Sequence, residues 1–212
     1  MLYIKQFTFS PIQENTYLLW NDNSDAVIID PGCYERYEEE ELKGFIDKNH
    51  LVPRMLLNTH CHLDHVFGEK YVASTWSLVP HIHPNEQKVL SFAEASGKMW
   101  GMPFETYEGP LNFFKEGDII KLGSDELKVL FAPGHSPGHV CFYCASQGFV
   151  IGGDVLFSGS IGRTDLPGGN LEVLMKSIRT QLMVLPDETK VYSGHGPVTT
   201  VGEERRTNPF LV

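Results

Sequence analysis

The sequence has few cysteines, no long apolar run and no excess of positive charge. Only four of its 212 residues are cysteine, which is too few for a scaffold held together by disulfide bonds. No apolar stretch approaches the ~20 residues that are needed to span a bilayer. The net charge of −10 argues against non-specific binding to nucleic acid, and no basic patch is present. These absences indicate a soluble globular protein without a nucleic-acid or membrane partner.

The N-terminal residues and the cysteines favour a cytoplasmic location. Residues 1–9 lack the layout of a secretory signal and are typical of a first strand. Cys141 and Cys144 form a Cys-x-x-Cys pattern, which is often a redox or zinc motif. Because they lie three apart in an expected strand, their thiols should point to opposite faces. We therefore predict that they are reduced packing residues.

The stretch Thr59–His65 supplies three imidazoles and one carboxylate within seven positions, directly after a short apolar strand. These groups are common ligands of zinc and other divalent metals. His60 and His62 are two apart, so in an extended segment both could reach one cation. Asp64 and His65 follow at the start of an expected helix and cannot easily reach the same cation. The spacing therefore favours a second cation beside the first.

Apolar periodicity predicts an α/β protein whose two halves have a similar layout. Strands are expected at 2–9, 16–20, 26–29, 54–58, 78–83, 118–122, 125–131, 139–145, 148–152 and 190–193, and helices at 35–49, 65–75, 85–96 and 171–182. Because no linker divides the halves, we expect one domain over residues 1–212, built as two stacked sheets with helices outside. The loop 97–110, which is rich in aromatic residues, could cover a substrate cleft or plug an edge of the core.

Three later turns repeat the order of an apolar strand, glycine and a possible metal ligand. The residues that follow these strands are His135, Asp154 and His195. Glycine permits a tight turn and leaves room for a cation. Ligands at the ends of strands far apart in the chain can converge on one edge of a sheet. The sequence therefore predicts a metal site assembled from both halves.

The order of these possible ligands resembles the metallo-β-lactamase superfamily over nearly the whole chain. The ligands are His60, His62, Asp64, His65, His135, Asp154 and His195. The resemblance implies an αββα sandwich of two stacked mixed β-sheets flanked by helices, with a two-metal site at its rim. It assigns one metal to a first trio (His60, His62 and His135), the other to a second trio (Asp64, His65 and His195), and a bridging role to Asp154. Two divalent ions are implied, zinc before iron or manganese.

Three shorter motifs resemble the glyoxalase II (hydroxyacylglutathione hydrolase) branch of that superfamily. They are Asn15–Tyr17, Gly134–His139 and Gly153–Phe157. The stretch Gly162–Asp165 is similar to short glyoxalase II-like proteins and to persulfide dioxygenases. Only 17 residues follow His195, so we expect the C-terminal helical region with which longer glyoxalase II enzymes bind glutathione to be missing.

The remaining polar residues leave alternatives open. Where longer glyoxalase II enzymes tend to have a lysine and a tyrosine that contact glutathione, this chain has Arg163 and Asp165. Arg163 could bind a substrate carboxylate, or it could pair with Asp165 and brace its own loop. His139 could support a metal ligand or be structural. The other histidines are expected in the core or at the surface: His50, His81 and His83.

We predict a metal-dependent thioesterase that acts on a small acyl-thioester. Two metals would generate a hydroxide at neutral pH for attack on the acyl carbonyl, and Asp64 could orient that nucleophile. The main alternative is an Fe(II) persulfide dioxygenase, because His60, His135 and Asp154 alone form a two-histidine, one-carboxylate set. Hydrolysis of a lactone or a β-lactam would use the same hydroxide. A structural zinc site is disfavoured, because such sites are closed and rich in thiolates.

Overall fold

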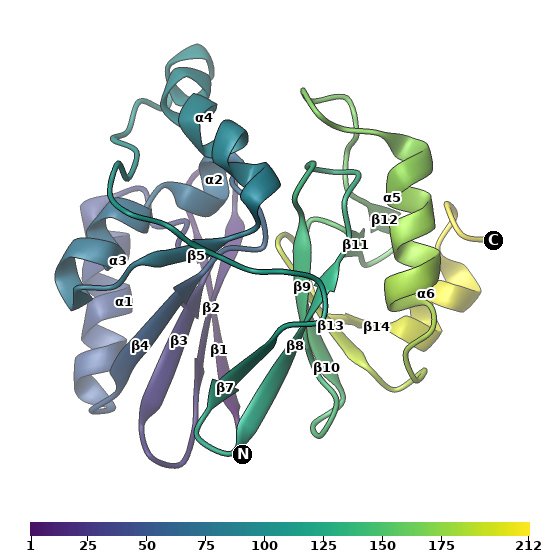
Figure 1. Cartoon of the computed structure of the whole chain (residues 1–212), viewed down its shortest axis with the longest axis horizontal. Coiled ribbons are helices and arrows are strands. Elements are labelled where there is room, and N and C mark those ends of the chain that lie inside the picture. The colour runs from purple at the N-terminus through teal and green to yellow at the C-terminus, as the bar shows by residue number, and fades with distance from the viewer.

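The computed structural model describes residues 1–212 and contains two six-stranded sheets that face each other (Figure 1). The first sheet, in spatial order, consists of β1 (Tyr3–Phe9), β2 (Glu14–Trp20), β3 (Asp25–Ile29), β4 (Val52–Leu57), β5 (Pro80–Ile82) and β6 (Asn112–Phe113). The second consists of β14 (Thr199–Thr200), β13 (Lys190–Ser193), β10 (Phe149–Gly153), β9 (Val140–Cys144), β8 (Asp125–Phe131) and β7 (Ile119–Leu122). A separate hairpin pairs β11 (Leu156–Phe157) with β12 (Ser160–Ile161).

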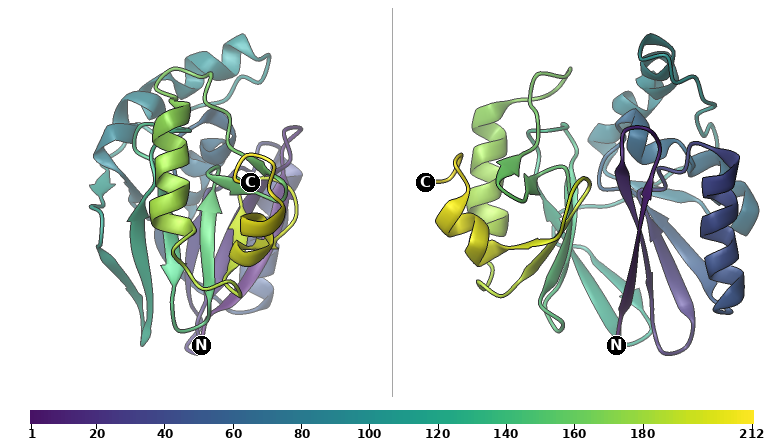
Figure 2. Two further views of the ribbon diagram at one scale, coloured as in Figure 1. Left: turned by 90° about the vertical axis from the view of Figure 1, so that its right-hand side faces the viewer. Right: turned by 180° about the vertical axis from the view of Figure 1, so that it is seen from behind.

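Helices cover the outer face of each sheet (Figure 2). Those on the first sheet are α1 (Arg36–Lys48) and α3 (Glu69–Trp76), and those on the second are α5 (Leu171–Ser177), which continues into the π-helical turn η2 (Ile178–Leu182), and α6 (Val201–Thr207). The remaining helices are α2 (Leu63–Val66) and α4 (Gln87–Met99), the latter preceded by the 3-10 turn η1 (Pro84–Glu86). The mixed sheets and their outer helices confirm the predicted αββα sandwich.

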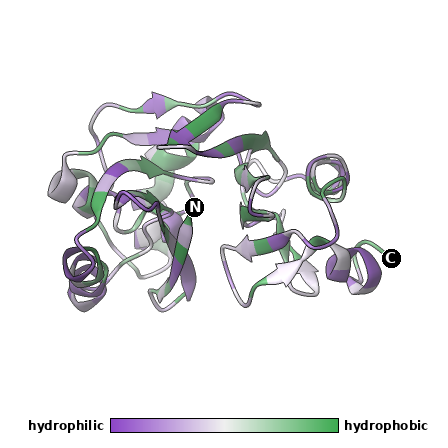
Figure 3. Ribbon diagram, turned by 90° about the horizontal axis from the view of Figure 1, so that it is seen from below, coloured by the Kyte–Doolittle hydropathy of each residue, from purple (hydrophilic) through white to green (hydrophobic).

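Strand β2 shows how one apolar stretch serves two cores. Neighbouring side chains on a strand point to opposite faces. Tyr17 and Leu19 pack against Phe142 and Ile151 of the second sheet, whereas Leu18 lies in the core beneath α1. Because both faces are covered, the second part of the strand, Tyr17–Trp20, is apolar without alternation. Figure 3 shows apolar stretches along the paired strands and hydrophilic stretches over the outer helices.

The cysteine prediction is confirmed. Cys144 lies in the core between the sheets, and Cys141 lies in the core between the second sheet and its helices. All four cysteines are buried and free of disulfide bonds. No helix in the structure has both the length and the apolar character that a bilayer crossing requires.

The predicted helix at 65–75 is wrong, because two helices, α2 and α3, meet there at Gly68. The Gly68 N–H donates to the carbonyl of Pro31 at 2.8 Å, and a Cβ at position 68 would lie 2.1 Å from the Cys33 Sγ. This close approach of two backbones requires glycine and interrupts the helix. The expected helix at 171–182 has the predicted bounds, but only its first part, to Ser177, is α-helical, and the rest is the π-helical η2. The sequence did not predict the short elements β6, β11, β12, β14 and α6.

One buried carboxyl, that of Glu69 at the start of α3, has no hydrogen-bond partner for either oxygen. Burial raises its pKa to about 8, and the nearby Asp30 contributes. In the unfolded chain the group titrates near its ordinary pKa of about 4.3. The protonated Glu69 carboxyl therefore contributes fully to the free energy of unfolding below about pH 4.3. This contribution is lost as pH rises through about 8.

We expect Glu69→Gln to become progressively more stable than the native protein between pH 5 and 8. The difference in the free energy of unfolding should grow by up to about 1.4 kcal/mol per pH unit, because the amide carries no proton to lose. Urea unfolding at several pH values measures it. Glu41→Gln, at an exposed position of α1, is the matched control. A pH-independent difference between Glu69→Gln and the native protein would contradict the assignment.

Candidate metal centre

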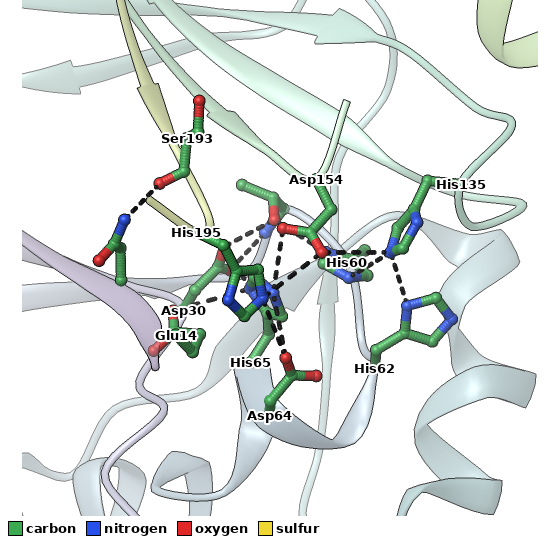
Figure 4. A network of polar contacts seen from close by, with 12 residues as sticks. Glu14, Asp30, His60, His62, Asp64, His65, His135, Asp154, Ser193 and His195 are labelled. Atoms are coloured by element: carbon green, nitrogen blue, oxygen red, sulfur yellow. Dashed lines mark hydrogen bonds and ion pairs between the residues drawn. The ribbon is translucent and has the colours of Figure 1, made fainter. Parts of the chain in front are cut away.

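The seven predicted ligands meet at the edge of the sandwich that carries α2 and the β11–β12 hairpin (Figures 1 and 4). His60 and His62 lie after β4, and Asp64 and His65 lie in α2. The other three follow β8, β10 and β13 and are His135, Asp154 and His195. Ligand atoms of the first trio lie within 4.8 Å of one another, as do those of the second trio.

Three imidazole nitrogens of the first trio converge on one point. His62 Nδ1 lies 2.8 Å from His135 Nε2, which lies 3.2 Å from His60 Nε2. Nitrogens that bind one tetrahedral zinc at 2.0–2.1 Å are ~3.3–3.4 Å apart. His135 Nδ1 donates to the carbonyl of Arg163 at 2.8 Å, which leaves Nε2 with a lone pair. The separations are therefore close to those of a shared cation.

The tautomer of His60 follows from its neighbours. The Thr59 hydroxyl donates to Asp30 Oδ2 at 2.6 Å, so it can only accept from His60 Nδ1, which lies 3.1 Å away. The His60 Nε2 atom therefore carries a lone pair that faces the lone pair of His135. Two facing lone pairs repel each other unless a cation lies between them. The donor set thus fits a metal ion.

The second trio is arranged in the same way. His195 Nδ1 donates to the carbonyl of Gln13 at 3.1 Å, and its Nε2 lies 3.1 Å from Asp64 Oδ2. His65 Nδ1 lies 3.1 Å from Asp30 Oδ2. The His65 Nε2 atom is buried and has no hydrogen-bond partner. An orphaned nitrogen beside two other ligand atoms is again the arrangement that a divalent cation would satisfy.

Asp154 lies between the two trios (Figure 4). Its Oδ1 is 3.4 Å from His65 Nε2, and its Oδ2 is 3.5 Å from His135 Nε2 and 3.6 Å from His195 Nε2. Oδ1 is buried without a hydrogen-bond donor. The Asp154 backbone N–H donates to His139 Nε2 at 3.0 Å. His139 therefore holds the backbone of the residue that carries the carboxylate, so it supports a predicted metal ligand, which was one of its two expected roles.

The electrostatics differ between the trios when no metal is bound. Burial lowers the pKa of His60 and His135, and it lowers that of His62 to about 3. Burial also lowers the pKa of His65 and His195, but the carboxylates of Asp154 and Asp64 outweigh it and raise both pKa values overall. The histidines of the second trio therefore keep their protons to higher pH than those of the first trio.

Two buried carboxylates that the sequence did not assign lie behind His65. Asp30 ends β3 and accepts hydrogen bonds from Thr59 N at 2.7 Å, from the Thr59 hydroxyl and from His65. Glu14 is fully buried; its Oε2 accepts from the Thr16 hydroxyl at 2.9 Å and its Oε1 lies 3.7 Å from His65 Nδ1. Asp30 directly follows an apolar strand, as the ligand turns do, but its glycine, Gly32, comes after the carboxylate and not before it. An acidic residue at the end of an apolar strand was the signal that could have identified it.

The motif Asn15–Tyr17 holds the loop that carries His195. The Asn15 side chain donates to the carbonyls of Ser193 at 3.0 Å and Gly196 at 2.9 Å. The Tyr17 hydroxyl donates to the same Ser193 carbonyl at 2.6 Å. The first hairpin of one sheet therefore fixes a ligand loop of the other.

The remaining candidates lie at the rim or outside the cluster. The Arg163 guanidinium forms two hydrogen bonds with Asp165, at 2.7 and 2.8 Å, and lies 5.9 Å from the Trp100 ring centroid. The bracing pair with Asp165 is thus present, and the loop after α4 contributes an exposed aromatic residue beside it. His81 and His83 stack on phenylalanines away from the trios, and His50 is exposed.

Known proteins similar to this chain cover almost all of its length. The model of the metallo-beta-lactamase superfamily matches residues 10–195. The probable metallo-hydrolase YqgX of Bacillus subtilis is 40% identical over 208 residues, which are 98% of this chain and 96% of that protein. The hydroxyacylglutathione hydrolase GloC of Haemophilus influenzae is 38% identical over 201 residues, which are 94% of this chain and 93% of that protein.

Two solved structures have nearly the same architecture. The BLEG-1 B3 metallo-beta-lactamase superposes with a TM-score of 0.91 at 38% identity, covering 99% of this chain and 100% of that chain. TTHA1623 in a di-iron-bound form superposes with a TM-score of 0.89 at 38% identity, covering 98% and 100%. With the αββα layers and the order of the clustered histidines and aspartates, these matches show that the chain belongs to the metallo-β-lactamase superfamily.

Proposed function

We propose that the chain is a metal-dependent hydrolase, and specifically a thioesterase of the hydroxyacylglutathione hydrolase type. The observation that carries the proposal is the convergence of two trios of nitrogen and oxygen donors, with the Asp154 carboxylate between them. Seven such donors exceed the needs of one tetrahedral structural zinc. Similarity to GloC over 94% of the chain supports the thioester as the substrate class.

Each trio would hold one divalent ion, and Asp154 would contact both. Metal ions in such a site lower the pKa of water towards ~7 and polarise the acyl carbonyl. The chain itself keeps the imidazoles in the required tautomers through Asp30 and the carbonyls of Arg163 and Gln13. We propose zinc for both positions; iron is the principal alternative, because the similar TTHA1623 structure is a di-iron form.

Asp64 is proposed to orient the nucleophile as well as to bind metal. Burial raises its pKa, but the charge of His65 and the hydrogen bond from His195 outweigh this, so the pKa is lowered overall. The group is therefore a carboxylate at neutral pH and can only accept hydrogen bonds. One of its oxygens faces His195, and the other can accept from an attacking water. The thiolate of the substrate is a good leaving group, so it can depart from the acyl carbon without being protonated by a strong acid.

Arg163 is proposed to bind a carboxylate of the substrate, with Trp100 as its neighbour across the rim. We expect Arg163→Ala to raise KM by about 10-fold, the range of one hydrogen bond to a charged group, while kcat changes little. Steady-state kinetics on lactoylglutathione measure both constants. Asp165→Ala is the control, since it removes the brace and leaves the guanidinium. Equal defects in both variants would mean that the pair only holds the loop.

To test the proposed function, one preparation of metal-free protein is divided, one part is loaded with zinc and the other with iron, and both are assayed. Lactoylglutathione hydrolysis by protein that holds two metals per chain is the expected result. Oxygen consumption with glutathione persulfide by a one-iron form, without thioester turnover, would replace the proposal with the dioxygenase. Turnover of a lactone or a β-lactam alone would keep the hydrolase and reject the thioester.

The two trios are expected to differ in proton release when metal binds. The carboxylates raise the pKa values of His65 and His195, whereas burial lowers those of the first trio, so the second trio should release more protons on binding metal. In the pH range where its histidines are protonated, affinity of the second trio should rise by about tenfold per pH unit for each displaced proton, and affinity of the first should depend less on pH. Titration calorimetry in buffers of different ionisation enthalpy measures the protons. Equal release by both ions would contradict the prediction.

A further inference from the structure

Glu86, in η1, is a fully buried carboxylate outside the two trios. Its Oε2 accepts from the backbone N–H of Cys61 at 2.9 Å. Its Oε1 accepts from the backbone N–H of Gly138 at 2.6 Å and from the hydroxyl of Ser136. Each donor comes from a loop that carries metal ligands, and the carboxylate lies between the two loops.

The donors flank the ligands of the first trio directly. Cys61 lies between His60 and His62, and Ser136 follows His135. A Cβ at Gly138 would lie 2.9 Å from the backbone nitrogen of Glu86 and 3.0 Å from its Oε1, so the turn approaches Glu86 as closely as glycine allows. One side chain therefore links two ligand loops that lie more than 70 residues apart in sequence.

Fixing these loops raises metal affinity, because ligands that are already in place lose less conformational entropy when the metal binds. The first trio has no carboxylate of its own, and the lone pairs of His60 and His135, whose Nε2 atoms lie 3.2 Å apart, must be held against their mutual repulsion. Polar groups that orient ligands from behind change metal affinity by about 10–100-fold when they are removed. Glu86 is placed to supply this restraint to two of the three ligand positions through Cys61 and to the third through Ser136.

We propose that Glu86 is a positioning residue that sets the affinity of the first trio for its metal by clamping the His60–His62 loop to the His135 loop. The inference rests on the metal centre of the proposed function and not on its thioester substrate. It predicts a defect confined to one of the two bound ions.

The test is a titration of metal-free Glu86→Gln with Zn²⁺ in competition with a chromophoric chelator. The amide keeps the volume and one acceptor oxygen, but it cannot accept on both sides. We expect one of the two binding steps to weaken by about 10–100-fold and the other to change by less than about threefold. Ser136→Ala, which keeps the carboxylate and its two backbone donors, should weaken the same step less. If Glu86→Gln does not fold, Ser136→Ala tests the proposal in its place.

Glu204→Gln is the matched control. Glu204 is also fully buried. It accepts hydrogen bonds from the Thr199 hydroxyl, the Gly159 backbone N–H and the Asn208 side-chain amide, and none of these residues adjoins the first trio. Both steps should keep their affinity in this variant. Equal weakening of both steps in Glu86→Gln, or the same change in Glu204→Gln, would reduce Glu86 to a general packing role and overturn the proposal.

The double variant His62→Ala/Glu86→Gln shows which of the two metal ions is bound in the weakened step. His62→Ala removes a first-trio nitrogen, so Glu86→Gln should add little to the loss in that background; a full additional loss would overturn the proposal. Unfolding of the metal-free variants in urea separates lost affinity from lost stability. A native protein that binds two ions but hydrolyses no thioester would reject the thioesterase and leave this inference standing. A protein that binds no metal would reject both.

Discussion

The Asp154→Asn variant is expected to retain at most one of the two metal ions proposed for the native protein and to turn over at least ~10³-fold more slowly. The carboxylate lies 3.4 to 3.6 Å from histidine nitrogens of both trios, so it is the only predicted ligand placed to contact both ions. Lewis-acid stabilisation by a metal is worth several kcal/mol, and each 1.36 kcal/mol is a tenfold change in rate. Losing one ion therefore accounts for the expected rate.

Asparagine is the informative substitution because it preserves the shape of the side chain. The hydrogen bond from the backbone N–H of residue 154 to His139 is unaffected, so the loop after β10 should stay in place. Metal content by mass spectrometry and kcat are measured together. Asp165→Asn, at an exposed position of the same rim, is the control and should keep both ions. Native metal content in Asp154→Asn would remove the bridging assignment.

Asp30→Asn is expected to produce the second largest effect, although Asp30 belongs to neither trio. Its Oδ2 accepts from both the Thr59 hydroxyl and His65 Nδ1. An amide nitrogen there can only donate, so His65 Nδ1 would have to accept and its proton would move to Nε2. That tautomer has no lone pair facing Asp154 and cannot bind metal. Affinity for the second ion should fall by about 10²-fold or more. In serine proteases, a catalytic histidine in the wrong tautomer lowers kcat by about 10⁴-fold.

The control for this variant is the residue at the start of β3, the strand that Asp30 directly follows. Asp25, at the other end of β3, pairs with Arg54 at the surface, and Asp25→Asn should leave metal binding unchanged. The Nε2 and Nδ1 protons of His65 can be distinguished by NMR of histidine labelled with ¹⁵N. A native tautomer and two tightly held ions in Asp30→Asn would show that Asp30 does not orient His65.

The sequence predicted the parts of the site that repeat a local pattern. Strand, glycine and ligand follow one another at His135, Asp154 and His195, and the structure brings all three to one rim. Asp30 also follows an apolar strand, but no glycine precedes it, so it does not repeat the pattern of the ligand turns. Glu86 could not have been found in this way. It lies in a short turn after Pro84, and its role arises only from the packing of loops that are remote in sequence.

The fold was predictable for a related reason. Strand segments with both faces covered, such as Tyr17–Trp20 in β2, are visible as short apolar runs. Two-residue strands such as β6 and β14 contain too few side chains for any periodicity. The break between α2 and α3 depends on how closely Gly68 approaches Cys33, a contact between segments that periodicity does not relate.

The distribution of ligands along the chain has a consequence for biosynthesis. The first trio is complete once residue 135 has left the ribosome, but Asp154 and His195 emerge only after most of the second sheet. A nascent chain can therefore assemble one half of the centre long before the other. Loading of the two proposed metal positions would then be sequential in time, in the order in which their ligands are synthesised.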